Sequence, residues 1–302
     1  MRATSISIGI GQYLHEEYAK SDMRLHFAQD DAQAFSLYAR GADDVDDSDT
    51  RHRLLVDGEA DWDGVRLAAT QIAAAGRPDL FLLYLSGHGE AGVAPTGGWF
   101  CLVDAKPGEP SLTGSRIEEL LRIVDASNTL LIVDCCFAEA LIGRCDFFRH
   151  LQNSRARFAV ASARADQRSW EDSGLKRSVF SDVLIRSLSV GSAVADASGH
   201  VDVERALFPA LREQVPLLAS SRKDGAIQEP VTAGMATQEI RLPTVFGRSL
   251  GRPLSVSEAI RSGVKRFLVA AAVVLVATLA GLDALVYHLA FRPLGRSSSV
   301  PA

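Results

Sequence analysis

Two apolar runs of the sequence end in side chains that could carry out acyl transfer. One run (128–133) ends at Asp-Cys-Cys (134–136), and the other (80–85) ends at Ser-Gly-His-Gly (86–89). A cysteine attacks as its thiolate, and a neighbouring imidazole is one of the usual groups that remove the thiol proton. A histidine and a cysteine that meet in the folded chain would therefore support peptide hydrolysis through a thioester.

The two runs are typical of strands buried on both faces of a parallel sheet, because they are short, mainly apolar and end at polar residues. Functional groups collect at the carboxyl ends of such strands. We therefore expect His88 and Cys136 to share one edge of the sheet. A helix predicted over 137–143 would place the Cys136 thiol near a helix N-terminus, which lowers a thiol pKa. Gly87 and Gly89 would leave a backbone N–H free for a developing oxyanion.

The rest of the chain up to Pro243 alternates between strand and helix patterns. This alternation predicts an α/β fold with a mostly parallel sheet and helices on both faces. The expected strands are 5–10, 53–56, 79–85, 99–103, 128–133 and 157–163, and the expected helices are 32–40, 61–75, 117–124, 178–189 and 201–215. We expect Asp30 and Asp31 to cap the first long helix.

Other interpretations of the same residues are open at this stage. A cysteine after a strand is often only a small buried hydrophobe. A metal site built from Cys135, Cys136, Cys145 and His150 is disfavoured, because structural zinc ligands are usually two to four residues apart. The sequence from Gly9 to Leu14 begins like a dinucleotide-binding motif but lacks its last glycine, so we predict no cofactor.

Composition narrows the function further. The net charge of −5 with 23% charged residues provides no basic surplus for nucleic acid. Four cysteines in 302 residues, two of them adjacent, indicate reduced thiols and not a disulfide framework. The N-terminus lacks the uninterrupted apolar stretch of a signal peptide. We therefore expect the first 243 residues to lie in the cytoplasm.

The C-terminal 60 residues or so differ in character from the rest. A linker over 244–266 carries five basic residues and one acid, Glu258. The apolar segment 267–290 follows, interrupted by Asp283 toward one end, and a short tail occupies 291–302. A spanning helix needs about 20 apolar residues, so we predict a single transmembrane helix with the basic flank on the cytoplasmic side. A helical hairpin buried in an assembly is the alternative.

Several motifs together resemble the caspase-like cysteine peptidases, and the metacaspase and orthocaspase branch is the most similar. The segment 84–89 resembles their histidine motif, and 133–136 resembles their Asp-x-Cys motif. The segments 29–32, 161–167 and 178–184 resemble other family segments in the same order. The resemblance covers about Thr4 to Pro243 and implies a caspase-like three-layer sandwich. It divides 1–243 into a large-subunit-like part (1–150) and a small-subunit-like part (151–243).

The resemblance also implies roles for individual residues. His88 would be the general base and Cys136 the nucleophile, with the backbone N–H groups of Gly89 and Cys136 as the oxyanion hole. Asp31, Ser86 and Asp134 would hold an Arg or Lys side chain before the scissile bond, a match of carboxylates to a cation. Caspases proper hold Asp with an arginine, and Arg24 keeps that alternative open.

The chain departs from the family after the nucleophile, where Phe137-Ala138-Glu139 replaces His-Ser-Gly. A catalytically inactive scaffold that recruits partners at a membrane is therefore the second hypothesis, and a hydrolase of non-peptide acyl groups is the third. No run of acids marks a calcium site, and calcium dependence stays open. By family analogy alone, a membrane-anchored cytoplasmic endopeptidase of this kind would act on a protein partner, as a stress or defence effector.

Overall fold

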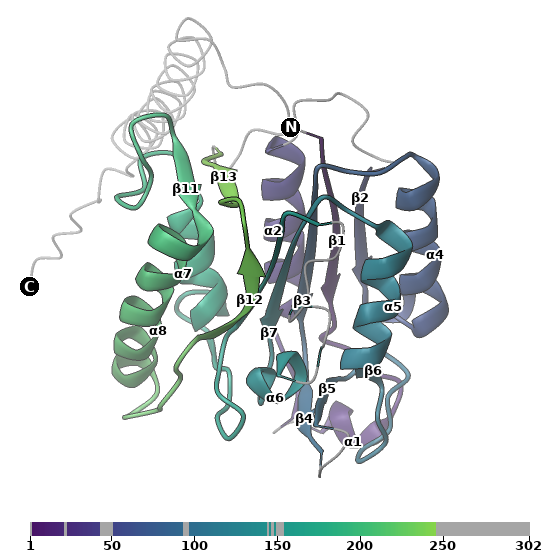
Figure 1. Cartoon of the computed structure of the whole chain (residues 1–302). Helices are drawn as coiled ribbons and strands as arrows, with labels where there is room; N and C mark the ends of the chain where they lie inside the picture. Colours follow the sequence, from purple (N-terminus) through teal and green to yellow (C-terminus); the bar gives the residue numbers. More distant parts are fainter. Residues whose placement is uncertain are drawn as a thin grey trace, which may run out of the picture. The chain divides into compact units, whose positions relative to one another are not determined.

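The central feature of the computed structural model is a six-stranded sheet in the order β12-β8-β7-β3-β1-β2 (Figure 1). All its pairings are parallel except that of β12 with β8. Its strands are β1 (Ala3–Gly9), β2 (His52–Val56), β3 (Leu80–Ser86), β7 (Asn128–Asp134), β8 (Ala156–Ala161) and β12 (Val231–Ala236). The structure describes residues 2–20, 23–42, 51–92, 97–143, 145, 148 and 154–245.

Alternating side chains of the sheet enter two separate apolar cores. On β3, Phe81, Leu83 and Leu85 belong to one core, whereas Leu80, Leu82 and Tyr84 belong to the other. Successive side chains of a strand point to opposite faces, so a strand that is apolar throughout must be covered on both sides. This confirms the predicted mostly parallel sheet with helices on both faces.

The helices divide between the two faces. The first core contains buried residues of α4 (Trp62–Ala74), α5 (Gly114–Val124) and α6 (Ala138–Ile142). The second core contains those of α2 (Ala28–Gly41), α7 (Val179–Ser187) and α8 (Phe208–Arg222). The short helical elements are α1 (Glu16–Ala19), a 3-10 turn (Asp57–Glu59) and a π-helical turn (Val203–Leu207).

Within the described residues, three small sheets lie outside the main one, and the first of them follows directly after His88. It is formed by β4 (Gly89–Ala91), β5 (Gly98–Phe100) and β6 (Leu112–Thr113). The other two pair β9 (Glu171–Asp172) with β10 (Arg177–Ser178), and β11 (His200–Asp202) with β13 (Arg241–Pro243). The segment predicted as a strand over 99–103 is thus an arm of a small antiparallel sheet.

Several predicted helix boundaries were wrong, and two of them differ most. The helix expected over 201–215 begins only at Phe208 and runs to Arg222. Residues 200–202 pair with β13 as a strand, and the Asp202 carboxylate caps the turn that follows by accepting the Arg205 N–H. Helix α2 begins four residues earlier than predicted, at Ala28.

The predicted transmembrane segment 267–290 and the tail 291–302 lie outside the described residues, as does the linker apart from residues 244 and 245. Among the residues that the structure describes, none of the helices combines the length and apolar character needed to cross a membrane.

Candidate active site

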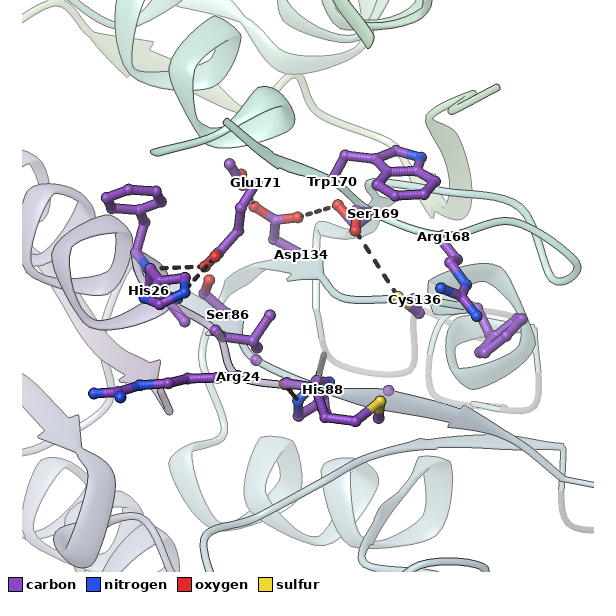
Figure 2. A pocket seen from close by; sticks show the side chains of 18 of the residues that line it. Arg24, His26, Ser86, His88, Asp134, Cys136, Arg168, Ser169, Trp170 and Glu171 are labelled. Atoms are coloured by element: carbon purple, nitrogen blue, oxygen red, sulfur yellow. Dashed lines mark hydrogen bonds between the residues drawn. The ribbon is translucent and has the colours of Figure 1, made fainter. Parts of the chain in front are cut away.

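Strand register brings the two motifs to the same edge of the sheet. β3 and β7 are parallel neighbours, and Ser86 pairs with Asp134 at their carboxyl ends. His88 and Cys136 each lie two residues beyond this pair. Both line one cavity of about 620 Å³, and Figure 2 shows their side chains at its wall. The sequence prediction that these residues share one sheet edge is therefore correct in its geometry.

His88 is held tightly on its own side of the cavity. The residue is 8% exposed, and its ring lies against the rings of Tyr13 and Tyr18, with centroids at 5.1 and 5.3 Å. Its backbone N–H donates to the Tyr13 hydroxyl at 2.7 Å. Its Nε2 lies 2.5 Å from the Met23 carbonyl oxygen, which can only accept. A neutral imidazole carries one N–H, so Nε2 is the donor and Nδ1 is the basic nitrogen.

Burial lowers the pKa of His88, while the Met23 carbonyl and the Glu90 carboxylate act in the opposite direction. A lowered pKa keeps the ring neutral at physiological pH, the form that can accept a proton. The ring therefore has the protonation state and the free nitrogen that a general base needs.

Cys136 reaches the cavity from the end of β7. Its thiol contacts the Ser169 carbonyl oxygen at 3.9 Å, and within the described residues no hydrogen bond joins it to His88. Burial raises the pKa of the Cys136 thiol, and the positive charge of Arg168, which also lines the cavity, lowers it. The thiol is therefore protonated at rest and must lose its proton before it can attack.

The adjacent thiol differs sharply from Cys136. Cys135 is 2% exposed and belongs to the apolar core between the sheet and α6. Cys101 and Cys145 are also buried, and of the four cysteines, all of which the structure describes, only Cys136 lines the cavity. In the described part of the chain no three His, Cys, Asp or Glu residues are placed to hold a metal ion, and His150 lies outside it.

Close packing explains both glycines of the histidine motif. A Cβ at Gly89 would lie 2.2 Å from the Cys136 carbonyl oxygen and 2.6 Å from the Cys135 sulfur. A Cβ at Gly87 would lie 2.8 Å from both the Phe100 ring and the Tyr13 hydroxyl. Only glycine fits beside the Phe100 and Tyr13 side chains at position 87 and beside the end of β7 at position 89.

The small sheet also leaves the Gly89 N–H available. The Cys101 N–H donates to the His88 carbonyl at 2.9 Å, which makes Gly89 and Phe100 a non-hydrogen-bonded pair of the β4–β5 ladder. The Gly89 N–H therefore does not point at β5. The assignment of this group and of the Cys136 N–H to an oxyanion hole stays a prediction.

A group of carboxylates occupies the other side of the cavity. Asp134 is buried and accepts hydrogen bonds from the hydroxyls of Ser169 at 2.6 Å, Ser181 at 2.8 Å and Ser178. Burial raises its pKa, and these hydroxyls lower it. Ser86, which pairs with Asp134 from β3, also lines the cavity. The structure thus places Ser86 and Asp134 together, as the sequence predicted.

Asp31 lies behind this group and not in the cavity wall. It is buried on α2, where its Oδ2 accepts the Ser178 N–H at 2.9 Å and its Oδ1 has no hydrogen-bond partner. Burial raises its pKa, and the nearby charge of Asp134 raises it further. The prediction that Asp31 caps the helix was wrong: α2 begins after Phe27, without a side-chain cap, and Asp31 turns inward.

Glu171 is the acid that the sequence analysis missed. It lines the cavity, and its two carboxylate oxygens accept the N–H groups of His26 and Phe27, each at 2.8 Å, at the start of α2 (Figure 2). Burial raises its pKa, and these N–H groups lower it. No local signal marks this residue, because its partners lie more than 140 positions away. Arg24 also lines the cavity, with its side chain exposed.

The segment after the nucleophile departs from its predicted form. Helix α6 begins at Ala138, one residue later than expected, and has only five residues. Phe137 precedes it in a left-handed conformation, with φ of 57°. A left-handed residue cannot continue a right-handed helix, so the chain turns sharply after Cys136 before α6 begins.

Comparison with known proteins supplies a fold but not a family. No protein-family model matches the chain, and no curated protein matches it. Among solved structures, the chain is similar to protein GSU0716 from Geobacter sulfurreducens, with TM-score 0.54, 16% identity, and coverage of 82% of this chain and 100% of that one. It is also similar to caspase-1 from Spodoptera frugiperda, with TM-score 0.51, 15% identity, and coverage of 79% and 88%. The chain therefore has a caspase-like fold.

Proposed function

We propose that this protein is a cysteine endopeptidase that cleaves after Arg or Lys, with His88 as the base and Cys136 as the nucleophile. The observation that carries the proposal is the Ser86–Asp134 pairing, since it places an imidazole, an accessible thiol and buried carboxylates around one cavity. The caspase-like fold supports a peptidase, and the metacaspase branch is the one that its motifs resemble.

The chemistry follows from the two side chains. His88 Nδ1 takes the proton of the Cys136 thiol, and the thiolate attacks the substrate carbonyl carbon. The Gly89 and Cys136 N–H groups stabilise the negative oxygen of the tetrahedral intermediate. The imidazolium then protonates the leaving amine, which leaves a thioester. His88 next takes a proton from water, the hydroxide attacks the thioester, and the carboxylate product leaves with the thiol restored.

The carboxylates favour a basic side chain before the scissile bond. Asp134 and Glu171 line the cavity, and the buried Asp31 carboxyl lies behind them. All three have pKa values raised by burial, so a guanidinium or ammonium would stabilise their charged forms. A fork of N–H donors facing buried carboxylates is a specific match.

The natural substrate would be a protein met at a membrane. We propose that the apolar segment 267–290 anchors the chain as a single-pass helix, with the peptidase domain in the cytoplasm. Cleavage of a protein partner there would fit a stress or defence effector, which rests on the motif resemblance alone. Fractionation of cells expressing the chain with and without 267–302 tests the anchor: loss of membrane association on truncation is expected.

Labelling with a peptidyl-arginine electrophile tests the proposal. Covalent labelling should occur in the wild type and in Cys135→Ala, and should disappear in Cys136→Ala. Intact mass identifies the modified residue, and a peptidyl-aspartate electrophile tests the specificity that Arg24 leaves open. Faster labelling by the aspartyl electrophile than by the arginyl electrophile would contradict a pocket for a basic side chain.

One observation favours a scaffold as the second candidate. The Cys136 thiol contacts the Ser169 carbonyl and not His88, and its pKa is raised. A scaffold would show no labelling by either electrophile with or without calcium, and no hydrolysis of a panel of small esters, while still binding partners at the membrane. Ester hydrolysis without peptide hydrolysis would instead indicate an acyl hydrolase.

A further inference from the structure

Gln228 is a fully buried amide in the loop between α8 and β12, outside every motif discussed above. Its Oε1 accepts a hydrogen bond from the backbone N–H of Trp170 at 3.2 Å. Its Nε2 donates to the Ser162 carbonyl at 3.2 Å and to the Ser169 hydroxyl at 3.0 Å. A side-chain amide has two N–H donors, so both are used.

The direction of these hydrogen bonds is determined by the partners. The Ser169 hydroxyl has one proton, which it donates to Asp134 Oδ1 at 2.6 Å, so it can only accept from Gln228. The backbone N–H of Trp170 can only donate, so it requires the amide oxygen of Gln228. A flipped amide would lose all three bonds, and Gln228 therefore holds its two partners in one arrangement.

Both serines bound by Gln228 contact the end of β7. Ser169 holds the Asp134 carboxylate through its hydroxyl and faces the Cys136 thiol through its carbonyl oxygen. The Ser162 hydroxyl donates to the Cys135 carbonyl at 3.3 Å, and its N–H donates to Val133 at 2.8 Å. One buried side chain is thus connected, through Ser162 and Ser169, to the nucleophile and to the residues that precede it on β7.

The segment that Gln228 braces has little regular structure of its own. Residues 162–170 lie between β8 and β9, and three of them, Arg168, Ser169 and Trp170, line the cavity. The neighbouring Glu229 holds the same segment, since its N–H donates to Gln167 Oε1 at 2.8 Å. Backbone hydrogen bonds from Phe137, Glu139 and Val179 also hold this segment, and the side-chain contacts of Gln228 and Glu229 add to them at Ser169 and Gln167.

We infer that Gln228 is a positioning residue for the candidate active site: through Ser169 it orients the Asp134 carboxylate toward the substrate and sets the carbonyl that faces Cys136. The inference rests on the proposed function for its effect on substrate binding, and on geometry alone for its effect on the thiol. Gln228 itself does not touch the cavity.

Steady-state kinetics on an arginyl peptide amide provide the first test. Gln228→Leu should raise KM about tenfold to a hundredfold, because a buried hydrogen bond to a hydroxyl that serves a carboxylate is lost, with kcat changed less than KM. If the leucine variant does not fold, the same measurement is made on Gln228→Glu, which keeps the side-chain volume. Gln238→Leu, which removes an exposed amide bound to Arg155 at 3.4 Å, is the matched control and should leave KM unchanged.

A double-mutant cycle tests the route through Ser169. Ser169→Ala should raise KM as Gln228→Leu does, and the double variant should be no more than about twofold worse than the more affected single variant, because coupled residues are not additive. If the increases in KM of the two single variants multiply in the double variant, the inference is overturned. A lowered melting temperature with KM unchanged in the folded protein would overturn it as well.

Alkylation of Cys136 by iodoacetamide separates this inference from the proposed function, because it needs no peptidase activity. Gln228→Leu should speed the reaction about two- to fivefold at pH 7.5, since the weak S–H contact to Ser169 is disturbed, and Cys136→Ala identifies the labelled site by mass. If the wild type cleaves no peptide but Gln228→Leu alkylates faster, the proposed function fails and the positioning role stands. An unchanged alkylation rate together with an unchanged KM would exclude that role.

Discussion

The two sides of the candidate active site are held by different kinds of contact. His88 lies between Tyr13 and Tyr18, and its other partners are a hydroxyl and a backbone carbonyl from the same N-terminal region. The end of β7 is held by a network of hydroxyls and the Gln228 amide, all from the C-terminal half of the described chain. Aromatic packing therefore positions the base, and hydrogen bonds position the acid pocket.

This difference determines how each side should respond to change. The rings packed on His88 exclude water, and this burial lowers its pKa, so truncation of a ring should change the pKa of the base. The hydroxyls bound to Asp134 lower its pKa and so favour the charged carboxylate in a buried site. Removal of a hydroxyl donor or of the charge should therefore change substrate affinity. The four predictions below test this contrast, from the largest expected effect to the smallest.

Removal of the base should have the largest effect. We expect His88→Ala to lower kcat on an arginyl peptide amide about 100- to 10,000-fold, which is the usual contribution of general acid–base catalysis, with little change in KM. His200→Ala is the control, because His200 contacts the exposed Ser198 and does not line the cavity. A loss of activity in the control equal to that in His88→Ala would contradict the assigned role.

Removal of the buried charge should change affinity instead of the chemical step. We expect Asp134→Asn to raise KM for arginyl substrates about tenfold to a hundredfold, because a charge-assisted hydrogen bond is lost, while Cys136 alkylation continues. In the wild type, burial raises the pKa of Asp134 above its value in the unfolded chain. The folded protein without substrate therefore loses stability as pH rises from the unfolded pKa of about 4 through the raised value.

Melting temperatures measured between pH 4 and 8 check the sign of this dependence. The wild type should show a component that falls with rising pH, and Asp134→Asn should flatten it. An arginyl ligand should bind more tightly as pH rises over the same range, because it stabilises the charged carboxylate. Binding that weakens with rising pH would contradict a carboxylate pocket for a cation.

Gly89→Ala should destabilise the junction between the two sides. The new Cβ would lie 2.2 Å from the backbone oxygen of Cys136, which cannot move away alone. We expect a loss of about 1–3 kcal/mol in the free energy of unfolding, measured by urea denaturation. Gly58→Ala is the matched control, since a Cβ there meets no atom within 4 Å, and it should be neutral or slightly stabilising.

The smallest predicted effect concerns the aromatic contact. Tyr18→Ala exposes one face of the His88 ring, and burial is the main cause of its lowered pKa. The pKa should rise toward 6.5, and the acidic limb of the kcat profile should move up by about half a pH unit. An acidic limb that does not move, in a protein that remains folded, would show that Tyr18 does not set the environment of the base.

Much of the fold was predictable because its signals are local. The apolar runs 80–85 and 128–133 predicted β3 and β7, and their polar ends predicted where His88 and Cys136 would lie. Helix boundaries were less predictable: the apolar period near residue 201 belongs to a strand and a π-helical turn before α8 begins. The membrane anchor at 267–290 stays a prediction.

The site was only partly predictable, for a different reason. Glu171 contacts the start of α2 across more than 140 positions, and Gln228 reaches Ser169 across 59. An isolated Glu or Gln in a loop carries no pattern that marks it. Asp31 looked like an N-terminal cap by its position, but its carboxylate is buried and accepts the Ser178 N–H from a segment 147 positions away.

The sequence by itself determined the buried strands, the glycines beside His88 and the choice of residues with reactive side chains, because these depend on side-chain period and on backbone steric demands. The tertiary structure alone decided that Glu171 joins Asp134 at the cavity and that Gln228 and the serines hold the end of β7. Those features depend on the order and register of strands, which juxtapose loops far apart in the chain, and no local pattern contains that information.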